Sequence, residues 1–138
     1  MTFEHTETAT TTADADAVWA LWSDPATWAT WDPPVQEVVL DGPFAEGATG
    51  TLTLAGPFAV PVRLEVVEPG RRYLDVLEMG ELRIRIDHVL TPRAEGGCDL
   101  VVHTVIDGPG AADIGPMVTS EAPVALAALA AMAEGRPA

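Results

Sequence analysis

Hydrophobic and polar residues follow a helical period near the start of the chain, an alternating period through the middle and a helical period again at the end. Residues 2–12 are rich in threonine and predict a first strand, with Thr12 or Asp14 capping the helix that follows. The apolar face of this helix has three- and four-residue spacing: Val18, Leu21 and Trp22. Asp24-Pro25 then starts a second short helix, which Pro33-Pro34 ends.

The remaining elements are an antiparallel series of strands and one long C-terminal helix. Strands are expected at residues 35–40, 51–54 and 99–107, with two hairpins between residues 60 and 90. The final helix covers about residues 112–134, and Pro123 is expected to break it near Thr119-Ser120. Its inward stripe contains many small side chains: Val118, Ala122, Leu126, Leu129 and Ala133. An α+β domain of this order encloses a pocket between the sheet and its helices.

The first hairpin turns at Glu68-Pro69-Gly70-Arg71, where Pro and Gly occupy the central positions of a type II turn. Turn geometry sets the register of the flanking strands, and the register decides which side chains share a face. The expected pairs are Val67 with Arg72, Val66 with Tyr73, Leu64 with Asp75, and Val62 with Leu77.

The second hairpin turns at Met79-Gly80-Glu81-Leu82, with Gly at the first central position of a type II′ turn. The expected pairs are Glu78 with Arg83, Leu77 with Ile84, Asp75 with Ile86, and Tyr73 with His88. For the last strand, one register sets Leu90 opposite Leu100 and brings Thr104 beside Ile86.

The two turns predict one consistent buried face across the middle strands. Its apolar members are Val60, Val62, Leu64, Val66, Leu77, Met79, Leu82, Ile84 and Ile86. Three polar side chains lie among them, namely Tyr73, Asp75 and His88. The opposite face is charged and faces solvent: Arg63, Glu65, Arg72, Glu78, Arg83, Arg85 and Asp87.

Composition narrows the class of protein. The chain has 138 residues, which suit a single domain over 1–138, and 48% of them are hydrophobic. Cys98 is the one cysteine, so no intrachain disulfide forms, and the start lacks the pattern of a secretory signal. A cytoplasmic location is therefore expected. The net charge of −14, with seven arginines and no lysine, argues against nucleic-acid and membrane partners.

The order of elements and several local motifs resemble the START-like (SRPBCC) superfamily, in particular its polyketide cyclase/dehydrase branch. The resemblance covers nearly the whole chain, and its motifs are structural. They are residues 11–19 (TTADADAVW), 23–31 (SDPATWATW), 41–47 (DGPFAEG), 68–70 (EPG) and 107–109 (DGP).

This resemblance implies a helix-grip fold, in which a seven-stranded antiparallel sheet curls around a long C-terminal helix and leaves an internal cavity. Relatives use the cavity to bind lipids, sterols, polyketides or plant hormones, or to do chemistry on them. Aromatising cyclases of this fold tend to carry an arginine inside the cavity. Every strand arginine of this chain is expected on the outward face, which departs from that pattern.

Asp75, His88 and Tyr73 are the candidate catalytic residues. A carboxylate and an imidazole in an apolar pocket form a plausible proton shuttle, and a phenol beside them could donate to a developing enolate. The structural alternative is that Tyr73 and His88 satisfy each other at a strand end. The histidines match no ligand motif, so neither a metal nor a cofactor is expected.

The expected ligand is a small hydrophobic molecule, polyketide-like or aromatic, held in the cavity by a monomer or homodimer. The expected lining is Thr104, Leu64, Leu77, Ile84, Ile86, Val102, Trp28 and Leu126. Three functions stay open: an acid–base cyclase or dehydratase, a non-catalytic carrier, and an interaction module resembling a chaperone cofactor. An open cavity of ligand size would count against the third function.

Overall fold

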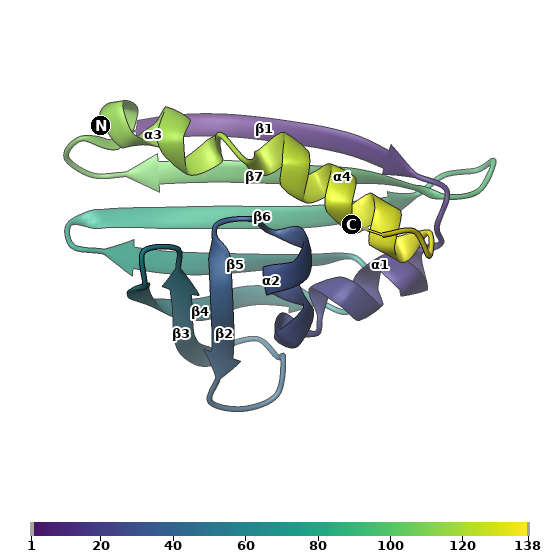
Figure 1. Cartoon of the computed structure of the whole chain (residues 1–138), viewed down its shortest axis with the longest axis horizontal. Coiled ribbons are helices and arrows are strands. Elements are labelled where there is room, and N and C mark those ends of the chain that lie inside the picture. The colour runs from purple at the N-terminus through teal and green to yellow at the C-terminus, as the bar shows by residue number, and fades with distance from the viewer. Residues whose placement is uncertain (1, 138) are drawn as a thin grey trace.

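The computed structural model describes residues 2–137 and contains a seven-stranded antiparallel sheet with helices on one side (Figure 1). The strands are β1 (Thr2–Thr11), β2 (Val35–Leu40), β3 (Thr49–Leu54), β4 (Phe58–Glu68), β5 (Arg72–Met79), β6 (Leu82–Pro92) and β7 (Cys98–Asp107). The helices are α1 (Ala15–Trp22), the 3-10 turn η1 (Pro25–Thr27), α2 (Trp28–Trp31), α3 (Ala111–Thr119) and α4 (Ala122–Ala133). Every predicted strand is present, with bounds within two residues of those expected where bounds were predicted.

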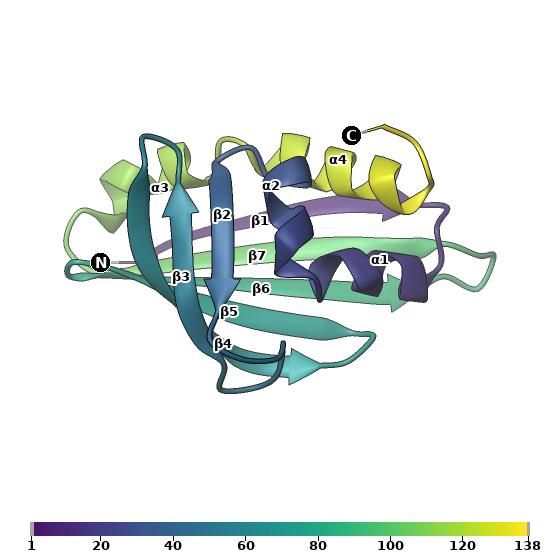
Figure 2. The same cartoon turned by 60° about the horizontal axis from the view of Figure 1, so that its bottom comes forward.

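The sheet has the strand order β1-β7-β6-β5-β4-β3-β2, so the N-terminal strand pairs with the last strand. The sheet curls strongly, and β2 and β3 run across the direction of β6 and β7 (Figure 2). Helices α3 and α4 lie along β1 and β7, α1 lies beside β6, and α2 lies beside β2 (Figures 1 and 2). This is the helix-grip architecture that the resemblance implied.

The two short helices begin where their caps predict. The Asp14 carboxylate accepts a hydrogen bond from the Ala17 amide at 2.9 Å, so Asp14, rather than Thr12, is the N-cap of α1. The Asp24 carboxylate accepts from the Ala26 amide at 3.2 Å and caps η1. Asp32 ends α2 directly before the two prolines.

The C-terminal helix is broken in two, as Pro123 predicted. Helix α3 ends at Thr119 and α4 begins at Ala122, which puts Pro123 in the first turn of α4. A proline is tolerated there because no carbonyl inside the helix would have received its N–H. Gly115 lets α3 approach β1 closely, since a Cβ at this position would collide with the Phe3 ring.

The second hairpin and the last strand have the predicted registers. Tyr73 lies opposite His88 and Asp75 opposite Ile86. Gly80 adopts a φ of +62°, which the turn requires and which glycine adopts without strain. Between β6 and β7, Leu90 pairs with Leu100 and Ile86 with Thr104.

The first hairpin differs from its prediction near the turn. Val67, not Val66, lies opposite Tyr73, because the connection has three residues rather than two and Glu68 pairs with Arg72. A β-bulge at Glu65 takes up the extra residue, so the predicted pairs of Leu64 with Asp75 and Val62 with Leu77 are correct. The inward assignment of Val66 was therefore wrong, and Val67 packs against the core in its place.

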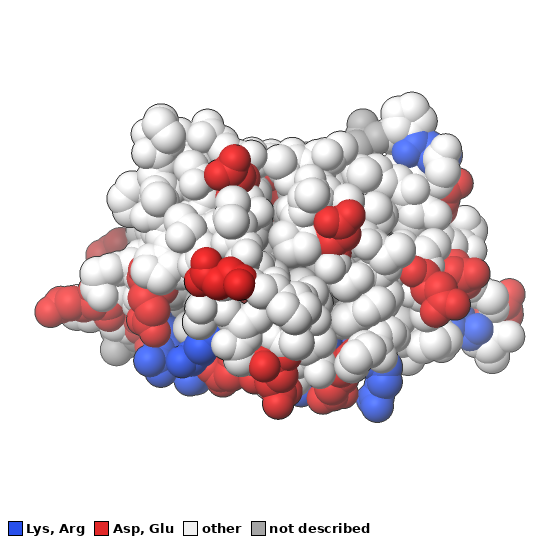
Figure 3. Space-filling model, turned by 90° about the horizontal axis from the view of Figure 1, so that it is seen from below, with Lys and Arg blue, Asp and Glu red and all other residues white. Residues whose placement is uncertain are grey.

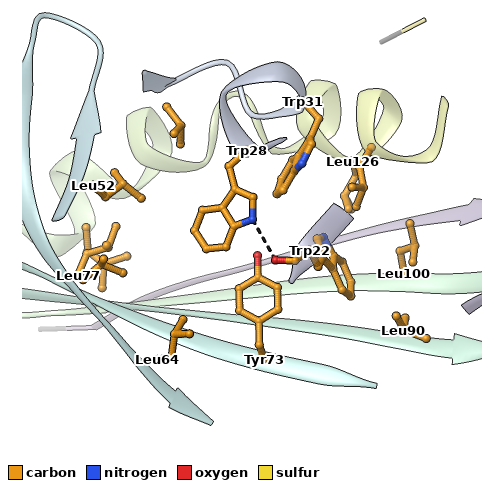
Figure 4. Close-up of a cluster of buried hydrophobic side chains, with 14 of the residues drawn as sticks. Trp22, Trp28, Trp31, Leu52, Leu64, Tyr73, Leu77, Leu90, Leu100 and Leu126 are labelled. Carbon is orange, nitrogen blue, oxygen red and sulfur yellow. Dashed lines mark hydrogen bonds between the residues drawn. The ribbon is translucent and has the colours of Figure 1, made fainter. Parts of the chain in front are cut away.

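The core forms between the concave face of the sheet and the helices (Figure 4). The Trp28 indole donates to the backbone carbonyl of Trp22 at 3.0 Å, and the Trp31 indole donates to the Thr27 hydroxyl at 3.2 Å. These bonds join α2 to α1 and η1 and supply partners for buried polar atoms. Val76 is buried on the opposite face of the sheet, where its neighbours across the strands are Arg63 and Arg85.

Candidate functional site

A cavity of about 410 Å³ lies between the concave face of the sheet, α2 and the two C-terminal helices. Apolar side chains make up most of its wall. The residues with polar side-chain groups at the wall are Trp22, Trp28, Trp31, Asp32, Tyr73, Asp75, His88, Thr104, Thr119 and Glu121. A concave, largely apolar site with a few polar groups is typical of small-molecule binding.

Asp75 is the most unusual of these residues. It lies in the middle of β5, is 3% exposed, and its Oδ1 atom has no hydrogen-bond partner among the described residues. Burial, with a smaller contribution from the nearby charge of Asp32, raises the pKa of the Asp75 carboxyl from 3.8 to about 8. Asp75 is therefore a neutral carboxylic acid at pH 7 in the empty cavity.

Tyr73 and His88 face each other across β5 and β6. Their rings stack with centroids 3.9 Å apart and planes at 6°. The His88 Nδ1 lies 3.3 Å from the Tyr73 backbone carbonyl, which only accepts, so Nδ1 carries the proton and Nε2 is the acceptor nitrogen. Burial lowers the pKa of His88 from 6.5 to about 4, so the imidazole is neutral near pH 7.

Tyr73 lies at the centre of an aromatic cluster. The Trp28 ring stacks on it at 5.6 Å and 24°, and the Trp22 and Phe44 rings meet it edge-on at 5.7 Å and 5.3 Å. Its hydroxyl points toward the hydrogen bond between Trp28 and Trp22 (Figure 4). Burial, together with the charges of Asp75 and Asp32, raises the Tyr73 pKa well above its usual value, so the phenol stays protonated.

Asp32 is a cavity residue that the sequence reading missed. It ends α2 and is half-buried, and burial with the charge of Glu121 raises its pKa from 3.8 to about 6. Asp32 follows Trp28 by four residues, so helical spacing places it on the same face as that buried indole. This spacing was the signal that could have identified it.

Most of the predicted lining residues do face the cavity, namely Thr104, Leu77, Ile84, Ile86, Val102, Trp28 and Leu126. Leu64 does not line the wall; it is fully buried, and its backbone binds Gly47 and Ala48 of the loop before β3. The structure brings Tyr73, Asp75 and His88 to one wall. Within residues 2–137 no hydrogen bond joins Asp75 to His88; Asp75 pairs with Ile86 across β5 and β6, and His88 pairs with Tyr73.

The charged residues predicted to face solvent form ion pairs outside the cavity. Arg72 donates to both carboxylate oxygens of Asp87, at 2.8 and 3.0 Å, and Arg83 pairs with Glu78 at 3.1 Å. In Figure 3 most of the visible arginine side chains lie along the lower edge, while acidic side chains are scattered over an otherwise uncharged surface. The strand arginines are thus on the outward face, as the alternation predicted.

A curled antiparallel sheet that closes with helices around an apolar cavity defines a class of α+β domains built to enclose a hydrophobic ligand. The family model described as "Polyketide cyclase / dehydrase and lipid transport" matches residues 2–134, and the chain belongs to this family. The resemblance noted in the sequence is thereby confirmed. A comparison with curated proteins finds no match.

Solved structures with the same fold cover almost the whole chain. A norcoclaurine synthase point mutant from Thalictrum flavum, in complex with a transition-state analogue, superposes with a TM-score of 0.76 at 14% identity, covering 98% of this chain and 96% of that one. Ara h 8.0201 gives a TM-score of 0.76 at 13% identity, with 99% and 100% covered. A Deinococcus radiodurans protein gives 0.60 at 16% identity, with 88% and 97% covered. At these identities the likeness establishes the fold alone.

Proposed function

We propose that this protein binds a small hydrophobic molecule, aromatic or polyketide-like, in the cavity and that Asp75 exchanges a proton with it. The observation that carries this proposal is the unpaired Oδ1 of Asp75, which is buried at the wall of an apolar cavity of about 410 Å³. A buried polar atom without a partner is costly unless a ligand or another group satisfies it.

The raised pKa suits acid–base chemistry. With a pKa of about 8, Asp75 donates a hydrogen bond as the acid and accepts a proton as the carboxylate within the neutral pH range. Tyr73 supplies a second donor, and the Nε2 of His88 supplies an acceptor. Thr104, across from Ile86, orients a carbonyl group of the ligand.

The reaction that fits these groups is an aldol cyclisation followed by dehydration. The Asp75 carboxylate takes a proton from the carbon next to one carbonyl, and the resulting enolate forms a carbon–carbon bond to a second carbonyl carbon. The oxygen of that second carbonyl gains a proton. Loss of this hydroxyl together with an adjacent C–H proton then releases water.

A non-catalytic carrier is the second candidate. The lack of a hydrogen bond from Asp75 to His88 within the described chain, and the bond of His88 to a backbone carbonyl, favour it. In a carrier the same polar groups fix the orientation of the ligand without moving protons. The unfilled cavity argues against an interaction module of this fold.

Isothermal titration calorimetry with 2-naphthylmethanol tests ligand binding. Ala125 lines the cavity and Ala127, on the same helix, is exposed. We expect the wild type and Ala127→Phe to bind alike, and Ala125→Phe to lose at least about tenfold in affinity because its ring occupies the cavity. Equal affinities of the two variants for a compound that the wild type binds would contradict the proposal.

Deuterium exchange at the methyl group of 2-acetylnaphthalene, followed by ¹H NMR in D₂O, tests proton transfer. Asp75→Asn should lose about a hundredfold of the exchange rate while keeping its affinity for 2-naphthylmethanol. Asp113→Asn, which changes an exposed carboxylate on α3, is the matched control and should exchange at the wild-type rate. Wild-type protein that exchanges no faster than buffer would leave the carrier as the function.

A further inference from the structure

The charged groups at the cavity wall all have one sign. Three carboxyl side chains line it, from Asp32, Asp75 and Glu121, and within residues 2–137 no arginine does. The chain contains no lysine, and its strand arginines pair with acids on the outward face. A ligand with a carboxylate or phosphate would therefore meet no countercharge inside.

The three carboxyl side chains differ in their exposure to solvent. Glu121 is exposed, Asp32 is half-buried, and Asp75 is 3% exposed. They lie on three different elements: the break between α3 and α4, the end of α2, and the middle of β5. A cation that enters from solvent past Glu121 thus meets increasingly desolvated carboxyl groups, and each attraction is stronger than it would be in water.

Asp75 is the position at which such a cation would bind. The Asp75 side chain lines the cavity, and its buried Oδ1 has no hydrogen-bond partner among the described residues. The other titratable side chains of the cavity wall are Tyr73 on the same strand, His88 on β6, Asp32 at the end of α2 and Glu121 between α3 and α4. Neutral His88 and protonated Tyr73 supply no positive charge, so the protein itself leaves the negative form of Asp75 uncompensated.

Aromatic rings form another part of the cavity wall. Trp22, Trp28, Trp31 and Tyr73 all line the cavity. The negative face of an indole or phenol ring attracts a cation, and desolvation strengthens that attraction. The same rings give the apolar part of a ligand a large contact area.

We propose that the ligand of this cavity is a hydrophobic amine, bound in its protonated form with the ammonium on Asp75 and its apolar part among the aromatic and aliphatic side chains. This inference rests on the proposed function, because it names the chemical class of the molecule that the cavity binds. Asp32 and Glu121 add negative potential between Asp75 and solvent and attract the cation toward it.

The binding step is linked to one proton. In the empty cavity Asp75 is an acid at neutral pH; when it meets the ammonium ion, its O–H bond breaks and the carboxylate forms an ion pair with the intact R–NH₃⁺ group. The proton leaves to buffer.

Three compounds with one ring system separate the alternatives by calorimetry at pH 7.5: 2-naphthylmethylamine, 2-naphthylmethanol and 2-naphthoate. We expect the amine to bind about tenfold more tightly than the alcohol, and the carboxylate most weakly. In phosphate and Tris buffers, which differ in ionisation enthalpy, the amine should release about 0.5 to 1 proton per ligand, and the alcohol none.

Asp75→Asn should abolish both the preference for the amine and the proton release while it still binds the alcohol. Asp113→Asn removes the same formal charge from the surface and should leave both unchanged. An amine that binds no better than the alcohol, or a preference that Asp113→Asn reduces as much as Asp75→Asn does, would overturn this inference and leave the proposed function standing. If none of the three compounds binds, the proposed function itself has failed.

Discussion

Replacing Asp75 by Asn should change how the stability of the ligand-free protein depends on pH. In the folded protein the pKa of Asp75 is about 8, whereas its ordinary value is 3.8. Between these two values the folded state holds a proton that the unfolded state has lost. The free energy of unfolding therefore falls as pH rises, and the contribution of Asp75 is fully present below pH 3.8 and lost as pH passes through 8.

The size of the effect follows from the width of this window. Each pH unit within it lowers the free energy of unfolding by about 1.4 kcal/mol, so the three units from pH 5 to pH 8 amount to about 4 kcal/mol. His88 acts in the opposite direction below pH 6.5, since its folded pKa of about 4 is lower than its ordinary value. Asn cannot ionise, and both proteins keep His88, so the difference between wild type and Asp75→Asn isolates the aspartate.

Urea unfolding monitored by tryptophan fluorescence at pH 5, 6, 7 and 8 measures this difference. We expect Asp75→Asn to gain stability relative to the wild type by about 4 kcal/mol between pH 5 and pH 8. Asp113→Asn, changed at an exposed position, should show no such trend. A difference between wild type and Asp75→Asn that stays constant from pH 5 to pH 8 would refute the claim that burial holds this carboxyl in its acid form.

Three further predictions concern the scaffold. Gly115→Ala should cost about 1–3 kcal/mol in urea unfolding, because the new methyl group meets the Phe3 ring and displaces α3 from β1; an unchanged midpoint would contradict this packing. Trp28→Phe should cost about 1–3 kcal/mol by the same assay, since it leaves a buried carbonyl of α1 without its donor at 3.0 Å; full stability would contradict the role of that bond. The Glu134 carboxylate has its pKa lowered from 4.5 to about 2, chiefly because the Thr11 hydroxyl donates to it, so its contribution is present above pH 4.5 and lost as pH falls through 2. Glu134→Gln should therefore lower the Tm at pH 6 but not at pH 2, and equal Tm losses at both pH values would contradict this.

The architecture was predictable because strong local signals agreed with one another. Caps and prolines placed the two short helices, and Gly80 set the register that puts Tyr73 opposite His88. The β-bulge at Glu65 was not predictable, since nothing in the local sequence shows whether an extra turn residue is absorbed within the strand. Val66 and Val67 are both apolar, so the pattern gave no preference for either as the inward residue.

The candidate site was predictable only in part. Alternation along β5 and β6 brought Asp75 to the concave face, and that placement needed no tertiary information. Asp32 reaches the cavity from the end of α2, whose position over the sheet depends on the packing of the whole domain. Leu64 has the inward orientation of a lining residue, but it is fully buried within the core, and the local sequence does not reveal that packing.

The titration of the Asp75 carboxyl carbon by ¹³C NMR tests the central claim most directly. In ligand-free protein labelled at the aspartate side chains, one carboxyl resonance, absent from Asp75→Asn, should titrate near pH 8. Saturation with 2-naphthylmethylamine should move that midpoint to lower pH. If this resonance titrated near pH 4 in the ligand-free protein, the account would be contradicted. Asp75 would then be an ordinary solvated carboxylate and not a buried carboxyl group that stays protonated at neutral pH.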